Sequence, residues 1–129
     1  MRNRKEQTLK IVTWVLIGVL SLLFFASSYA KIAGFPEINE RFATWGLSDM
    51  QTLIGFVMLI STVLFLIPAT FSLGVLLLSS FFGGTIATHM QHGESYTGPA
   101  RLLILVWIAY YLRNPSMFKK FLNFIKIQR

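Results

Sequence analysis

The sequence predicts an all-α fold: a four-helix transmembrane bundle with an interfacial amphipathic helix at its C-terminus. Of the 129 residues, 54% are hydrophobic and 13% are charged, whereas about a quarter of the residues of a soluble domain are charged. Four long apolar runs follow one another, and most of the basic residues lie outside them. A chain of this length has room for one domain, so residues 1–129 are expected to form a single transmembrane domain.

The apolar runs set the expected spans at about residues 11–33, 49–67, 70–89 and 99–113. A bilayer core of ~30 Å needs about 20 helical residues, which each run supplies or approaches. The second and third runs are separated only by the segment around Pro68, so they should form an antiparallel hairpin.

The first apolar run has a second interpretation, as a signal peptide. Basic residues precede it, and small residues that could form a cleavage site lie between Ala26 and Ala30. The length of the run favours a retained helix.

The net charge of +7 comes from basic residues near the two ends. Lys and Arg beside apolar segments mark the cytoplasmic side of a membrane protein, and nucleic-acid binding would instead require a basic face on a soluble fold. We therefore expect no nucleic-acid partner and a multi-pass protein of a bacterial inner membrane with both ends cytoplasmic. The basic residues are Arg2, Arg4, Lys5, Lys10, Arg113, Lys119, Lys120, Lys126 and Arg129.

Two segments are predicted to lie along the membrane surface. Residues 37–45 place Ile38, Phe42 and Trp45 at helical spacing. Residues 116–128 form an apolar face opposite a basic one, a pattern typical of an interfacial helix; binding to a calmodulin-type partner is the alternative. The apolar face consists of Phe118, Phe121, Leu122 and Ile125, and the polar face of Lys119, Lys120, Asn123 and Lys126.

Small residues recur every four positions along the third run. One row contains Gly83 and the next contains Gly84, and such rows let helix backbones approach closely in lipid. We expect them to pack within the bundle, with a homo-oligomer through the same face as the alternative.

Ionisable residues gather at the outer ends of the predicted spans, where they suggest a ligand-binding site. Lys31 ends the first span with Ser28 on the same helical face, and His89 and Glu94 follow the third span. Arg101 stands twelve residues before Arg113, about 18 Å along a helix. We expect Arg101 to be the buried arginine of the two and to pair with Glu94; snorkelling to the headgroups is the alternative.

No recognisable catalytic motif accompanies these residues, so no enzymatic reaction is predicted. The chain has no cysteine, which removes thiolate nucleophiles and thiolate metal sites. His89 and His92, three apart and followed by Glu94, could bind a divalent metal, but we predict that His89 instead forms a wall of a polar pocket.

Three motifs in order resemble the DoxX-like family of small four-helix membrane proteins. They are Ser-Ser-Tyr-Ala-Lys-Ile at 27–32, Leu-Phe-Leu-Ile-Pro at 64–68 and Gly-Gly-Thr-Ile-Ala-Thr-His-Met at 83–90. The resemblance covers roughly residues 10–113. It implies a Glu within the second span, where Met58 stands in this chain, and a link in some relatives to quinone-dependent oxidoreductases.

These observations predict a protein that holds a small amphipathic ligand, a quinone or a lipid, near the outer leaflet. A quinone would then be its cofactor. An accessory subunit that docks a membrane oxidoreductase is a variant of this prediction. The rival is a small four-helix transporter, although the first span lacks the carboxylate typical of small multidrug exporters.

Overall fold

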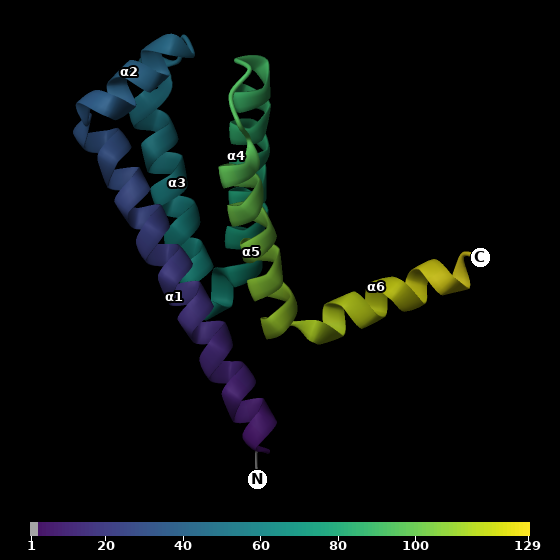
Figure 1. Cartoon of the computed structure of the whole chain (residues 1–129). Coiled ribbons are helices and arrows are strands. Elements are labelled where there is room, and N and C mark those ends of the chain that lie inside the picture. The colour runs from purple at the N-terminus through teal and green to yellow at the C-terminus, as the bar shows by residue number, and fades with distance from the viewer. Residues whose placement is uncertain (1–2) are drawn as a thin grey trace.

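The computed structural model describes residues 3–129, and in that part of the chain it contains six α-helices and no strand, which confirms the all-α prediction (Figure 1). Arg2, one of the expected N-terminal cations, lies outside the described residues. Two short 3₁₀ turns, Ser48–Met50 and Pro68–Thr70, precede α3 and α4. The helices are α1 Arg4–Ala33, α2 Pro36–Thr44, α3 Gln51–Leu66, α4 Phe71–Gln91, α5 Thr97–Arg113 and α6 Pro115–Ile127.

Helix α1 begins one residue after Asn3, earlier than the apolar run alone suggested. The side chain of Asn3 accepts a hydrogen bond from the Lys5 amide at 3.3 Å, which caps the helix start. The 30 residues of α1 span about 45 Å. The helix ends where Gly34 adopts a left-handed φ of 75°, a conformation that glycine takes without steric cost.

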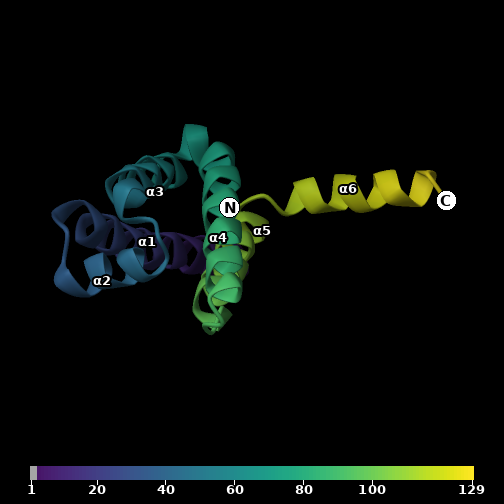
Figure 2. The same cartoon turned by 90° about the horizontal axis from the view of Figure 1, so that it is seen from above.

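The four long helices form a ring in which each helix packs against two neighbours. Helix α1 contacts α3 and α5, and α4 contacts α3 and α5. Phe24, Phe65 and Phe82 are buried at the centre, with the ring of Phe24 lying 6.4 Å from Phe65 and 5.2 Å from Phe82. Figure 2, which views the molecule from above, shows α2 on the α1–α3 side and α6 leaving on the opposite side.

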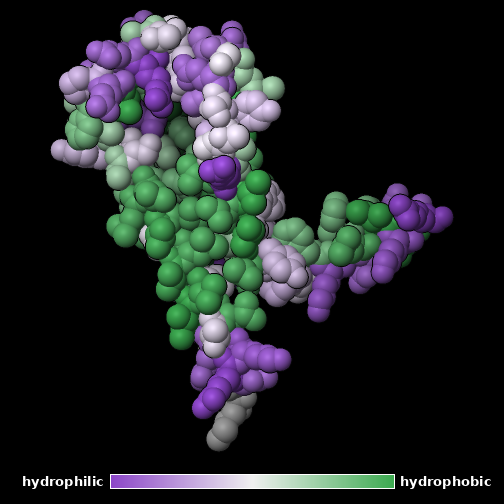
Figure 3. Space-filling model, in the orientation of Figure 1, coloured by the Kyte–Doolittle hydropathy of each residue, from purple (hydrophilic) through white to green (hydrophobic). Residues whose placement is uncertain are grey.

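Three helical segments are long and apolar enough to cross a membrane: Arg4–Ala33, Ser48–Leu66 and Pro68–Gln91. Helix α5 lies beside α4 and has 17 residues, about 26 Å at the rise of an α-helix. Figure 3 shows a hydrophobic belt across the middle of the bundle on the face in view, with hydrophilic surface at the α2 end and at the N-terminal tip.

Two glycines allow close contact between helices, and neither belongs to the predicted rows. A Cβ on Gly74 would overlap the backbone nitrogen of Phe65, so α3 and α4 touch at the hairpin. A Cβ on Gly55 would lie 2.9 Å from Ile32 Cγ1 of α1. A Cβ on Gly83 or Gly84 would meet nothing within 4 Å. The prediction that these last two glycines bring helices together within the bundle is therefore wrong.

The buried side chain of Gln51 joins α2 to the ends of two long helices. The amide of Gln51 donates to the carbonyl of Lys31 at 3.0 Å and to Oδ1 of Asn39 at 2.7 Å. Gln51 thus joins the end of α1, the middle of α2 and the start of α3, and its side chain is buried. This network fixes α2 against the ends of α1 and α3.

Candidate functional site

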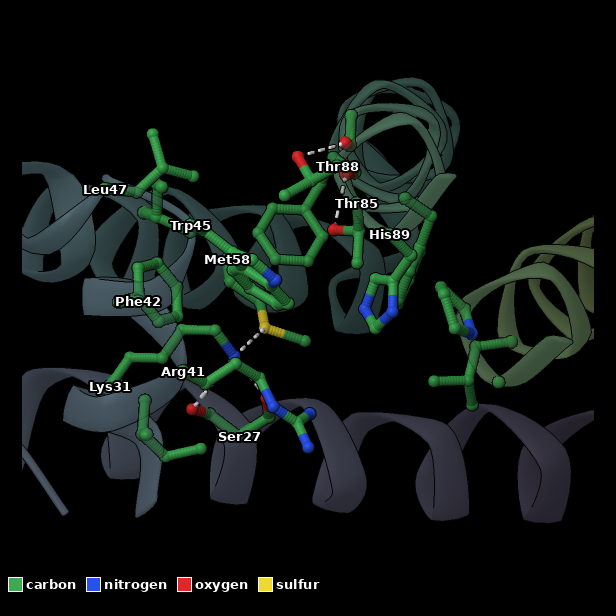
Figure 4. Close-up of a pocket in the computed structure, with 18 of the residues that line it drawn as sticks. Ser27, Lys31, Arg41, Phe42, Trp45, Leu47, Met58, Thr85, Thr88 and His89 are labelled. Atoms are coloured by element: carbon green, nitrogen blue, oxygen red, sulfur yellow. Dashed lines mark hydrogen bonds between the residues drawn. The ribbon is translucent and has the colours of Figure 1, made fainter. Parts of the chain in front are cut away.

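A cavity of about 1040 Å³ opens at the α2 end of the bundle. Residues of α1, α2, α3, α4 and α5 line it, together with the turn between α4 and α5. Ile38, Phe42 and Trp45, the apolar face expected to meet the membrane surface, line the cavity instead. Figure 4 shows the residues that approach the cavity from both sides.

Lys31 brings a positive charge into this cavity from the last turn of α1. Its ammonium donates to Oγ of Ser27 at 2.6 Å and lies 3.8 Å from the sulfur of Met58 (Figure 4). The ring of Phe81 lies 6.0 Å away. Within residues 3–129, no carboxylate lies within 4.0 Å of this ammonium. A cation with only neutral partners in a partly buried position lacks charge compensation.

A second cation, Arg41, reaches the cavity from α2. Its guanidinium carbon lies 5.9 Å from the ring of Trp45, within the range of a cation–π contact. Arg41 and Trp45 are four residues apart on one face of the helix. Folding α2 back over the bundle therefore places Arg41 at the same cavity as Lys31.

His89, Glu94 and Trp45 form a polar cluster on the other side of the cavity. The indole N–H of Trp45 donates to one oxygen of Glu94 at 3.2 Å, and the other oxygen lies 3.4 Å from Nδ1 of His89. The imidazole also contacts the indole ring edge-on, with centroids 5.1 Å apart. This cluster ties α2 to the end of α4 and to the turn that follows it.

The cavity is polar at its rim and apolar at its base. The lining residues, all within the described part of the chain, include two cations, Lys31 and Arg41, and a single carboxylate, Glu94. Phe24 and Phe82 line the base and are nearly fully buried. Beyond them, the Phe65 and Phe71 rings lie 5.1 Å apart and continue the aromatic core. The arrangement suits a molecule with a polar, electron-rich head and an apolar tail.

The structure brings three of the five predicted site residues to the cavity. Lys31, His89 and Glu94 line it, whereas Ser28 and Arg101 do not. Ser28 is fully buried and donates to the carbonyl of Phe24 at 2.8 Å. Arg101 is exposed. The expected partner of Arg101, Glu94, contacts His89 and Trp45 instead.

The two arginines of α5 reverse the predicted roles. Arg113 is the partly buried one, with its guanidinium carbon 4.8 Å from the ring of Trp14 and 4.6 Å from the ring of Phe71. The prediction that Arg101 is the buried arginine is therefore wrong. The aromatic rings at the end of the bundle opposite α2 stabilise the charge of Arg113. Because these rings belong to other helices, the spacing of residues along α5 could not predict the contact.

The alternative of a metal site is not supported by the described residues. The ring nitrogen Nδ1 of His92 lies 2.8 Å from the Thr88 carbonyl, and His92 does not line the cavity. Within residues 3–129, no group of three His, Asp or Glu side chains is close enough to hold a metal ion.

Sequence reasoning missed Ser27, Arg41 and Met58. Ser27 stands four residues before Lys31, so helical spacing alone could have identified it as a neighbour. Arg41 shares a face with Ile38 and Trp45, but its relevance depends on how α2 folds back. The family resemblance marks Met58 only as the position of a missing carboxylate, because its contact with Lys31 depends on the packing of α1 on α3.

Comparison with known proteins agrees with the motifs at 27–32, 64–68 and 83–90. No curated protein and no solved structure matches the chain. The family model of the DoxX-like family matches residues 15–110, which is well over half of the chain and includes Lys31, Met58 and His89. This protein belongs to the DoxX-like family.

Proposed function

We propose that this DoxX-like protein crosses a bacterial inner membrane four times with both ends in the cytoplasm. Three segments have the length and apolar character of spans, and α5 lies beside α4 as the fourth. The basic residues cluster near the two chain ends, as the positive-inside rule requires. The cavity then opens toward the outer leaflet.

We propose that the cavity binds an amphipathic molecule, a quinone or a lipid, through a carbonyl or anionic head. The observation that carries this proposal is the uncompensated ammonium of Lys31, whose partners are Ser27 and Met58. An ionisable residue at membrane depth is costly unless paired, and a ligand oxygen can supply the missing partner. Arg41 and His89, on different walls, provide further hydrogen-bond donors.

The shape of the cavity supports binding over transport. Its volume of about 1040 Å³ is at the upper end of the ~300–1,000 Å³ of typical ligand sites. Its base is blocked by Phe24 and Phe82, which pack on one another at 5.2 Å. A ligand held there would remain on one side of the bundle, as expected for a binding protein or an accessory subunit of a membrane redox complex.

The test measures retention of two defined probes, a short-chain ubiquinone and a short-chain phosphatidylglycerol, by native mass spectrometry. Lys31→Met keeps the apolar length and removes the charge. Because a hydrogen bond to a charged group contributes about 1.5–3 kcal/mol, we expect retention of at least one probe to weaken by roughly tenfold to a hundredfold. Arg41→Met should weaken retention in the same direction.

Arg101→Met is the matched control, because Arg101 lies at the same end of the bundle, is exposed and does not line the cavity. It should retain both probes like the unmodified protein. Equal loss in Lys31→Met and Arg101→Met would point to scattered surface charge, and no loss in either cavity variant would refute the proposal.

A further inference from the structure

Helix α6 carries an apolar face that the rest of the protein does not cover. Among the described elements, its main packing partner is α5. Phe118 is its anchor, with its ring 6.0 Å from that of Tyr110 and 5.3 Å from that of Tyr111. Phe121 and Leu122 are 62% and 56% exposed, so most of the apolar face needs a nonpolar environment from outside the chain.

The apolar face of α6 points in the direction expected for a helix at a membrane surface. In Figure 3, the hydrophobic side of α6 points toward the α2 end of the molecule, and its hydrophilic side points toward the end where the N-terminus lies. Pro115 begins α6 directly after Asn114, so the chain turns sharply at the end of α5. The turn directs α6 away from the bundle, at the level of the lower part of the hydrophobic belt (Figure 3).

The polar face of α6 is strongly cationic, and no carboxylate neutralises it locally. No Asp or Glu follows Glu94 in the sequence, whereas Lys119, Lys120, Lys126 and Arg129 all do. Lysines beside an in-plane helix attract anionic headgroups and act over about one Debye length. The partner indicated by this charge is an anionic lipid surface.

A groove in the angle between α5 and α6 provides the apolar half of a lipid site. Its volume is about 470 Å³. The groove is continuous with the apolar face of α6 through Phe118, and its walls are hydrocarbon and aromatic rings, which suit an acyl chain. Its lining residues are Leu103, Ile104, Trp107, Ile108, Tyr111 and Phe118.

We propose that α6 and this groove bind an anionic phospholipid of the leaflet on the side of the chain ends. The acyl chain lies against the groove, and the phosphate lies beside the lysine face of α6. This site is separate from the cavity at the α2 end and shares no lining residue with it. The inference is therefore independent of the proposed ligand of that cavity.

The experiment uses the full chain in nanodiscs, and the absence of cysteine allows a single label. A bimane fluorophore is attached to Phe121→Cys, and its quenching by brominated lipid is measured in two mixtures of phosphatidylglycerol and phosphatidylcholine. In one mixture the phosphatidylglycerol is brominated, and in the other the phosphatidylcholine is brominated, at the same fraction of brominated lipid. We expect at least twofold stronger quenching by the anionic lipid. Converting Lys119, Lys120 and Lys126 to Gln in this background should abolish the preference while general quenching persists.

The control label is Leu73→Cys, near the start of α4, where the side chain is 49% exposed and should report bulk lipid with no preference. Equal quenching of the Phe121 label by both lipids would overturn the proposal. So would a Phe121 label that neither lipid quenches, as expected if a second copy or another protein covers α6. An equally large preference of the Leu73 label for phosphatidylglycerol would also overturn the proposal, because the anionic lipid would then be enriched around the whole protein and not at α6.

Discussion

The side-chain nitrogen of Lys31 lies 3.8 Å from the sulfur of Met58, a contact between a cation and a neutral thioether. Met58 is buried on α3 and lines the same cavity. The resemblance to relatives places a carboxylate at this position of the second span, and the geometry indicates that such a carboxylate would pair with Lys31. In this chain the ammonium of Lys31 has the neutral partners Ser27 and Met58 instead.

Met58→Glu should therefore create an internal ion pair and compete with an anionic ligand. We expect retention of short-chain phosphatidylglycerol to fall by roughly tenfold to a hundredfold, because the new carboxylate replaces a charge-assisted contact of about 1.5–3 kcal/mol. Native mass spectrometry measures the bound fraction. Met58→Gln, which has the same shape without the charge, should retain the probe; similar losses in the two variants would show that shape alone matters.

Gly74→Ala should destabilise the bundle, because its Cβ would overlap the Phe65 backbone where α3 and α4 meet. Overpacking of this kind costs on the order of 1–3 kcal/mol. A lower thermal unfolding temperature in detergent is the expected result. Gly83→Ala is the control in the same helix: its Cβ has nothing within 4 Å, and the temperature should stay the same or rise slightly. Equal stability of the two variants would contradict the hairpin packing.

Trp45→Phe should loosen the attachment of α2 while leaving the bundle folded. It removes the indole N–H that donates to Glu94 at 3.2 Å and keeps an aromatic ring beside His89. A hydrogen bond to a charged group contributes about 1.5–3 kcal/mol, less where solvent reaches it. Hydrogen exchange within Pro36–Thr44 should accelerate, with exchange in α3 unchanged. Unaltered exchange in α2 would mean that Gln51 alone holds this helix.

The proposed orientation can be read from alkaline phosphatase fusions, because the enzyme is active only outside the cytoplasm. A fusion after Arg129 should be inactive, and one between Gln91 and Thr97 should be active. The opposite pattern would overturn the assignment of sides. Activity at both positions would mean that α5 does not cross the membrane.

The helices could be predicted from the sequence because their signals are local. Apolar runs and prolines located each helix end within about two residues, apart from the start of α1. The glycines at which two helices come into close contact could not be predicted from such local signals. Rows at Gly83 and Gly84 have the right spacing, but the rotation of α4 leaves both open and turns Gly74 toward Phe65.

The candidate site was predictable only in part for a similar reason. Residues at helix ends, such as Lys31 and His89, follow from where apolar runs stop. Arg41 reaches the cavity because Gln51 and Trp45 hold α2 across the bundle, which is a matter of tertiary structure. Arg101 and Ser28 were expected from chemistry and spacing, but their helices point them elsewhere.

The contact between Gly74 and Phe65 also has a mechanical consequence. It fixes α3 to α4 at the hairpin, while the cavity lies toward the other end of α4. From Gly74 to His89 the helix runs for 15 residues, about 22 Å at the rise of an α-helix. A rotation of about 5° about the Gly74 contact would move His89 by about 2 Å over such a length, widening the cavity mouth while the hairpin stays closed.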